Sequence, residues 1–291
     1  MAATDFVAGW VSGGVGLLAG HPFDTVKTRL QTAAGYNGMF DCFSKTVKQE
    51  SIAGLYRGMF LPFVSAGAVN SLLFAGYGLT LKLLHPNETN ARSKDLPMSE
   101  IMLASFCGTM CQLPVMVPVE AIKTKLQAQS DAIKSGIKRK VSFEGPWQCA
   151  RHVTKTEGLR GLYRGANMVT VREAVSSFFY IPLYEVCLKL LKDNGVNETT
   201  SQFLAGGTAG VACWITVCPL EVVKNRVLVH SGSKNGRELF RKVYREEGVR
   251  TFFRGGLALS VYGFLTNAAL FMVYEKCYAF LENLDVNKRK L

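Results

Sequence analysis

The chain has 291 residues, 48% of them hydrophobic, and carries a formal net charge of +12 at pH 7. No aromatic–basic binding motif accompanies that charge, which argues against a nucleic-acid partner. Its eight cysteines lack the paired spacing of zinc sites, and no nucleophile–base arrangement or metal cluster is visible, so we expect no metal, no cofactor and no enzyme.

Six stretches of the chain are long enough to cross a membrane as helices. Five of them are 18 to 24 residues long and hold no Asp, Glu, Lys or Arg, and another is interrupted only by Arg172-Glu173. A hydrocarbon core is crossed by about 20 apolar residues. We therefore expect an all-α membrane protein with six transmembrane helices, at Phe6–Phe23, Gly58–Leu81, Ile101–Val119, Gly165–Tyr184, Thr199–Leu220 and Gly255–Tyr274.

One eight-residue pattern closes the first, third and fifth of these stretches. It begins with proline, has an acid two residues on and a base three residues after that, and occurs at Pro22–Arg29, Pro118–Lys125 and Pro219–Arg226. A single copy is expected by chance in about one of a hundred chains of this composition, so three copies indicate repetition. The pattern places a proline, an acid and a base at the same depth of three helices, where the charges of one helix can pair with those of the next. This indicates a gate with three-fold symmetry, and hence a transporter.

A second pattern precedes each even-numbered stretch and sets a register for comparing them. It runs from an acid to a glycine at Glu50–Gly58, Glu157–Gly165 and Glu247–Gly255. Repetition at this period indicates duplicated units of span, short helix and span. We expect three repeats within one integrated transport domain, at residues 1–90, 97–194 and 199–285.

Basic charge is concentrated on one side of the predicted membrane. Segments 27–58, 123–165 and 224–254 hold 24 of the 34 bases but only 8 of the 22 acids. Since they follow the first, third and fifth spans, they share one face, and their charge orients that face inward. The same charge suits anionic lipid headgroups. No base precedes Lys27, so we expect targeting without an N-terminal basic leader.

These two patterns together resemble the mitochondrial carrier family (solute carrier family 25) over about Phe6 to Phe280. The resemblance implies six transmembrane helices, three short matrix helices, pseudo-three-fold symmetry and one central substrate site in a monomer. It also implies a multi-pass protein of the inner mitochondrial membrane with both termini toward the intermembrane space, and an anionic lipid such as cardiolipin at the matrix face. The stretch Gly20–Lys27 is most similar to the branch that carries carnitine, acylcarnitines and basic amino acids.

Carried over by resemblance, the three proline patterns form a matrix gate of ion pairs between neighbouring odd-numbered helices. The implied pairs are Asp24–Lys123, Glu120–Lys224 and Glu221–Lys27. The family's glutamine braces fall on Gln31 and Gln127, whereas the third brace position holds Leu228, so we expect a slightly weaker gate than one with three braces.

The opposite, cytoplasmic gate departs from the family's pattern. Each even helix has a tyrosine 19 residues after its register glycine, but no base stands at the expected position. We expect this gate to depend more on tyrosines and packing than on ion pairs. Its residues are Tyr77, Tyr184, Glu185, Tyr274 and Glu275.

The central substrate contacts implied by resemblance lie seven residues after the register glycines, at Ser65, Arg172 and Tyr262. An ion in the hydrocarbon region usually has a functional role. We expect Arg172 to hold a carboxylate and Glu173 a cationic nitrogen. Trp214 matches a tryptophan of the carnitine branch, and with Tyr262 and the rings of 178–180 it would suit an ammonium group. Tyr262 stands where that branch has arginine, which argues against carnitine itself.

The sequence therefore predicts a carrier for a small zwitterionic or cationic amino-acid-like solute. The candidates are a basic amino acid, a methylated amino acid or a carnitine-like betaine, moved by exchange or by uniport. An uncoupling-type proton or anion carrier and a degenerate carrier acting as a membrane scaffold are the alternatives. Three intact gate motifs argue against the scaffold, and the single cavity base Arg172 argues against nucleotides.

Overall fold

The computed structural model of the chain describes residues 2–33, 35–86, 96–129, 143–229, 235–266, 269 and 273; the side chains of 2–11, 198, 199, 202 and 203 lie outside this description. The described residues contain helices and no strand. The long helices are α1 (Ala2–Thr32), α3 (Phe60–Leu84), α4 (Met98–Gln127), α7 (Ala166–Asp193) and α8 (Glu198–Val229). Residues 256–266 begin a further helix.

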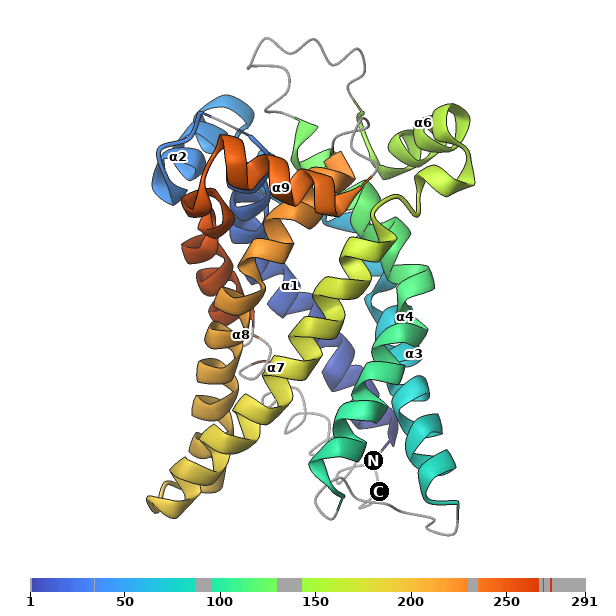
Figure 1. Cartoon of the computed structure of the whole chain (residues 1–291), viewed down its shortest axis with the longest axis vertical. Helices are drawn as coiled ribbons and strands as arrows, with labels where there is room; N and C mark the ends of the chain where they lie inside the picture. Colours follow the sequence, from blue (N-terminus) through green and yellow to red (C-terminus); the bar gives the residue numbers. More distant parts are fainter. Residues whose placement is uncertain are drawn as a thin grey trace, which may run out of the picture.

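Short helices connect the long ones at one end of the bundle. They are α2 (Met39–Glu50), α6 (Pro146–Glu157) and α9 (Gly236–Glu246), each followed by a 3-10 turn at Ile52–Tyr56, Leu159–Gly161 or Val249–Phe253. Figure 1 shows all three at the top, whereas α1 starts at the bottom. We call the end that holds α2, α6 and α9 the short-helix end.

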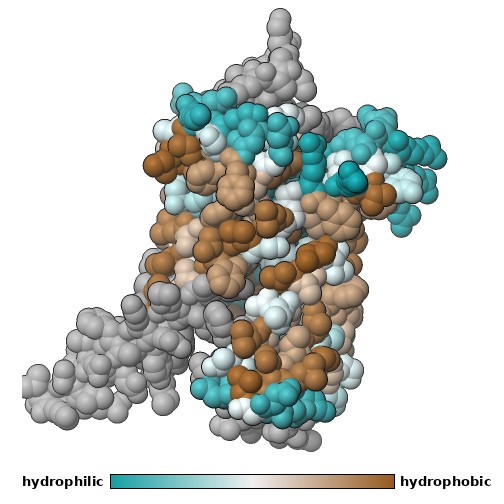
Figure 2. Space-filling model, turned by 90° about the vertical axis from the view of Figure 1, so that its left-hand side faces the viewer, coloured by the Kyte–Doolittle hydropathy of each residue, from teal (hydrophilic) through white to brown (hydrophobic). Residues whose placement is uncertain are grey.

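The predicted all-α membrane fold is confirmed. Four helical stretches of the described chain are long and apolar enough to cross a membrane, at Ile52–Leu84, Met98–Gln127, Leu159–Asp193 and Leu204–Val229. The first predicted span lies within α1, and residues 256–266 of the last predicted span are helical. Hydrophobic residues cover the middle of the face in Figure 2, and hydrophilic residues gather at both ends.

The proline patterns also build the core at the short-helix end. In each copy an apolar residue of the pattern and the apolar residue directly after the pattern are four positions apart, so they lie one helical turn apart on the same face. They are Val26 and Leu30, Ile122 and Leu126, and Val223 and Val227, and each pair packs on buried residues of the following short helix or turn. Three equivalent small cores therefore fix the short helices across the end of the bundle.

The register glycines turn the chain from each short helix into the next long one. Gly58, Gly165 and Gly255 have φ of 83°, 78° and 79°, a left-handed conformation that glycine adopts without a side-chain clash. A Cβ at Gly58 would lie 3.1 Å from the Lys123 carbonyl, and one at Gly255 3.3 Å from the Lys27 carbonyl. Both therefore pack against a long helix of another repeat, beside a base of a proline pattern.

Helices α3 and α4 approach each other closely through two glycines. A Cβ at Gly76 would lie 2.9 Å from the Gly108 Cα, and one at Gly108 would lie 2.5 Å from the Leu73 carbonyl oxygen. Small residues at such a crossing allow helix backbones to pack tightly in lipid. This crossing brings α3 to one wall of the candidate site.

Candidate functional site

The bases and acids of the three proline patterns meet in one buried layer near the short-helix end. Lys123 Nζ lies 2.5 Å from Asp24, Lys224 Nζ lies 2.9 Å from Glu120, and Lys27 Nζ lies 3.0 Å from Glu221. These are the three pairings implied by resemblance, and they link α1 to α4, α4 to α8 and α8 to α1. We call these six residues the ion-pair layer.

Further contacts within the layer join the three pairs into a network. Lys27 also lies 2.8 Å from Asp24, and Lys224 lies 3.1 Å from Glu221, in both cases one turn along the same helix. Buried charges are tolerated where each has an opposite partner at close range. The layer joins α1, α4 and α8 by ionic contacts at this level of the bundle.

The expected brace positions differ from one another in their contacts. Gln127 donates to Asp24 Oδ2 at 3.3 Å and accepts from Thr28 at 3.0 Å, so it supports one ion pair. Gln31 instead accepts from the Asn225 amide at 2.6 Å. Leu228, at the third position, is 1% exposed and packs beneath Gly165, where a Cβ would lie 3.1 Å from its Cδ2.

Arg172 and Glu173 form an ion pair on α7. Arg172 is 8% exposed, and its Nε lies 3.0 Å from Glu221 Oε2, an acid of the ion-pair layer. The sequence patterns did not reveal this contact, because Arg172 belongs to an even-numbered span and Glu221 to an odd-numbered one. Only the packing of α7 along α8 brings them together.

Trp214 and Tyr262, two aromatic residues of the predicted substrate site, lie near Arg172. The Arg172 guanidinium stands 4.9 Å from the centre of the Trp214 ring, and Trp214 meets Tyr262 edge-on at 6.4 Å. Lys27 Nζ lies 5.7 Å from the Tyr262 ring. Both rings thus face cations of the protein itself in this conformation.

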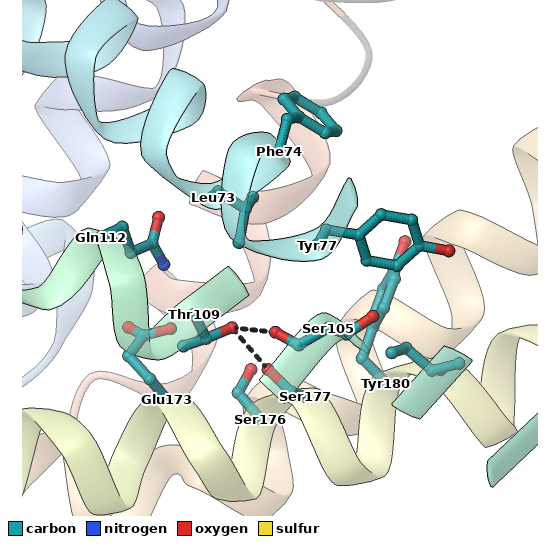
Figure 3. A pocket seen from close by; sticks show the side chains of 11 residues that line it. Leu73, Phe74, Tyr77, Ser105, Thr109, Gln112, Glu173, Ser176, Ser177 and Tyr180 are labelled. Carbon is teal, nitrogen blue, oxygen red and sulfur yellow. Dashed lines mark hydrogen bonds between the residues drawn. The ribbon is translucent and has the colours of Figure 1, made fainter. Parts of the chain in front are cut away.

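Glu173 lines a cavity of about 380 Å³ between α3, α4 and α7. Hydroxyl and amide groups occupy one part of its wall and three rings another, as Figure 3 shows. The Thr109 hydroxyl lies 3.4 Å from that of Ser177 and donates to the Ser105 carbonyl at 2.8 Å. The cavity is lined by Leu73, Phe74, Tyr77, Ser105, Thr109, Gln112, Glu173, Ser176, Ser177, Tyr180 and Ile181.

The remaining predicted site residues are spread over the rest of the bundle. Ser65 is half-buried, and its hydroxyl is 3.5 Å from the Pro62 carbonyl of its own helix. Tyr184 stacks on Tyr180 with ring centres 6.2 Å apart, while Glu185 is exposed. Tyr274 and Glu275 lie outside the described residues. Phe178 and Phe179 are about half-exposed, and Phe178 packs against Phe106.

Sequence reasoning used the second pattern only as a register, but its acids bind the last base of each proline pattern. Glu50 binds Arg29 at 2.8 Å, Glu247 binds Arg226 at 2.5 Å, and Glu157 lies 3.8 Å from Lys125. The hydrogen-bonded Arg226 guanidinium holds the pKa of Glu247 below its usual range. In all three copies, the acid of the second pattern follows the last base of the proline pattern along the chain. This recurrence is the signal that could have predicted these ion pairs.

Comparison with known proteins agrees with the repeated patterns. The family model described as "Mitochondrial carrier protein" matches residues 1–88, 94–195 and 196–284. The chain is 38% identical to solute carrier family 25 member 45 of Mus musculus over 284 residues, covering 94% of this chain and 98% of that protein. It is 34% identical to solute carrier family 25 member 47-B of Danio rerio (94% and 98%) and 32% identical to mitochondrial substrate carrier family protein S of Dictyostelium discoideum (93% and 95%).

Proposed function

Because the chain belongs to the mitochondrial carrier family, we propose that it moves a zwitterionic or cationic amino-acid-like solute across the membrane by alternating access. Members of this family are transporters of small molecules rather than enzymes, and they are multi-pass proteins of the inner mitochondrial membrane. The proposal concerns which solute is carried and which residues bind and release it.

One observation carries the choice of solute. Arg172 and Glu173 place a buried cation and a carboxylate side by side on α7, and the carboxylate opens into the cavity. A solute with its own carboxylate and cationic nitrogen can bind both groups and leave neither charge unpaired. Basic amino acids, methylated amino acids and carnitine-like betaines have this chemistry.

The cavity itself suits the cationic end of such a solute. Phe74, Tyr77 and Tyr180 supply rings to a part of the cavity wall away from Glu173 (Figure 3), and rings attract ammonium groups. The hydroxyls of Thr109 and Ser177 supply acceptors for an N–H donor in the same wall. In this proposal Tyr180, which the sequence suggested together with Trp214 and Tyr262, binds the ammonium group with Tyr77.

The conformation described here corresponds to a carrier closed at the short-helix end. We infer that this end faces the matrix, that the ion-pair layer is the matrix gate, and that the termini face the intermembrane space. Tyr77, Tyr184, Glu185, Tyr274 and Glu275 would form the opposite gate after the helices rock inward. Transport then requires the solute to stabilise the occluded state more than the open states.

Uptake by liposomes containing the purified protein tests this function. We expect accumulation of labelled basic or methylated amino acids or betaines, and strong loss of uptake in Arg172→Ala and Glu173→Ala. Uptake confined to nucleotides or dicarboxylates would contradict the proposed solute class. Fatty-acid-activated proton conductance without amino-acid uptake, spared by Arg172→Ala, would indicate an uncoupling-type carrier, and no transport of any kind a scaffold.

Two further proposals concern the lipid at the basic short-helix end and the oligomeric state of the carrier. We infer that anionic lipid such as cardiolipin binds there and that the carrier works as a monomer. Native mass spectrometry from cardiolipin-containing micelles would test both, with a lipid-bound monomer as the expected species and a lipid-free dimer as the contrary result.

A further inference from the structure

Glu221 holds more cations than its place in the proline pattern requires. Its Oε1 lies 3.0 Å from Lys27 Nζ and 3.1 Å from Lys224 Nζ, both of the ion-pair layer. Its Oε2 lies 3.0 Å from Arg172 Nε. Glu221 is 1% exposed, so these three cations replace solvent as its partners.

Arg172 is in turn divided between two carboxylates. Its Nη1 binds Glu173, which lines the cavity, while its Nε faces Glu221. Arg172 Nε and Glu221 Oε2 are buried atoms without a well-oriented hydrogen bond among the described residues. Their contact is therefore ionic but not directional, and such a contact can be exchanged for a better-aligned carboxylate.

The charges of the layer and of the solute site are each balanced, but the contact between Arg172 and Glu221 joins the two groups. Asp24, Glu120, Glu221 and Glu173 face Lys27, Lys123, Lys224 and Arg172. A zwitterion that takes both Arg172 and Glu173 leaves three acids and three lysines in the layer, which is again neutral. It also removes from Glu221 the one cation that does not belong to the gate helices α1, α4 and α8.

We propose that Arg172 is the positioning residue that couples solute binding to the ion-pair layer. In the empty carrier Arg172 stabilises the closed layer through Glu221, and Glu173 competes for the same guanidinium. A solute carboxylate that aligns with Arg172 withdraws it from Glu221 and weakens the layer, while the solute cation satisfies Glu173. The inference rests on the proposed function for the identity of site and gate, but its test requires no solute.

The test measures opening of the layer in purified protein without solute. A reporter cysteine replaces Thr28, which is 2% exposed and directly follows Lys27. The rate at which a water-soluble maleimide labels position 28 is followed by peptide mass spectrometry. Arg172→Gln removes the cation from Glu221 and should raise this rate about fivefold, as expected for the loss of a stabilising contact of roughly 1 kcal/mol.

Glu173→Gln should have the opposite effect. Because the neutral glutamine no longer competes for the guanidinium, Arg172 can align fully with Glu221. The labelling rate at position 28 should therefore fall below that of the protein with the Thr28→Cys substitution alone. A role of both residues in folding alone would instead raise labelling in both variants. Lys242→Gln is the matched control, since Lys242 pairs with Glu246 on the surface of α9 at 3.9 Å and should leave the rate unchanged.

Shifts in opposite directions support the coupling; shifts in the same direction, or no shift in either variant, overturn it. If Arg172→Gln does not fold, Arg172→Lys takes its place, because lysine keeps the charge but cannot reach both carboxylates with a planar fork. It should raise labelling by a smaller factor, and an unchanged rate would overturn the proposal. Normal amino-acid uptake with same-direction shifts would leave the proposed function standing and remove only this coupling.

Discussion

At the residue scale, the three copies of the second pattern share one unusual backbone conformation but place different residues in it. The chain turns after each short helix through Ser51, Gly158 and Gly248, with φ of 63°, 70° and 79°. All three have ψ within 10° of ±180°, a region that is almost restricted to glycine. Ser51 is the non-glycine residue that adopts a positive φ in the described chain. The first repeat therefore carries a strained residue where the others have none.

Replacing Ser51 by glycine should relieve that strain. We expect Ser51→Gly to raise the stability by about 1 kcal/mol, within the range for residues in sparsely populated backbone regions. Thermal unfolding of the purified protein in detergent measures the change. Ser44→Gly is the matched control: Ser44 lies exposed within α2, where glycine should lower stability by roughly 0.5–1 kcal/mol. A lower midpoint for Ser51→Gly would contradict the strain.

At the element scale, the position of α3 depends on a close crossing with α4. The apolar length of the two stretches predicted both helices. Because glycine is common in membrane helices, the sequence could not predict which glycines meet. The structure shows that Gly76 and Gly108 face each other, with Cys111 also against Gly76. Because α3 supplies Phe74 and Tyr77 to the cavity wall, this crossing determines the width of the candidate site.

Gly108→Ala should therefore disturb both stability and transport. The new Cβ would fall 2.5 Å from the Leu73 carbonyl oxygen, which belongs to backbone and can move only with α3. Overpacking of this kind costs typically 1–3 kcal/mol, and a shift of α3 should also lower solute affinity in the liposome assay. Gly67→Ala, in open space on α3, should leave both measurements unchanged. Equal behaviour of the two variants would argue against the crossing as described.

At the scale of the whole molecule, one carboxylate of the ion-pair layer has more ionic contacts than the others. Glu221 contacts Lys27, Lys224 and Arg172, whereas the ionic contact of Glu120 within the described chain is with Lys224. Although the proline patterns are equivalent in sequence, their acids are not equivalent in the bundle. The inequality arises because Arg172 stands on α7, next to α8, where the other even-numbered spans have Ser65 and Tyr262.

Neutralising the two acids should reveal this inequality. Glu221→Gln removes one of two acid partners from each of three buried cations and should lower stability by about 3–5 kcal/mol, the usual cost of breaking a buried ion pair. Glu120→Gln affects one lysine that keeps Glu221 as a partner, so the loss should be clearly smaller. Unfolding midpoints of both variants without solute give the comparison. A loss for Glu120→Gln as large as that for Glu221→Gln would contradict the arrangement.

The sequence by itself determined the membrane fold, the family and the common depth of the charges in the ion-pair layer, whereas the pairing among those charges was implied by the family resemblance. Apolar runs of spanning length predict helices without regard to context, and a pattern repeated three times with constant spacing places equivalent residues at equivalent depths. The same repetition predicted Arg172 and Glu173 as the exceptional charges of the central span. These features follow from local properties of the chain and from its internal symmetry.

Only the tertiary structure decided where the symmetry is broken. The contact of Arg172 with Glu221, the orientation of Trp214 and Tyr262 toward cations of the protein, and the cavity beside Glu173 all depend on how α7 packs between α4 and α8. Such contacts join residues that occupy different registers and different kinds of helix. No periodicity in the chain encodes them, because they result from the relative position of helices and not from the pattern within any one of them.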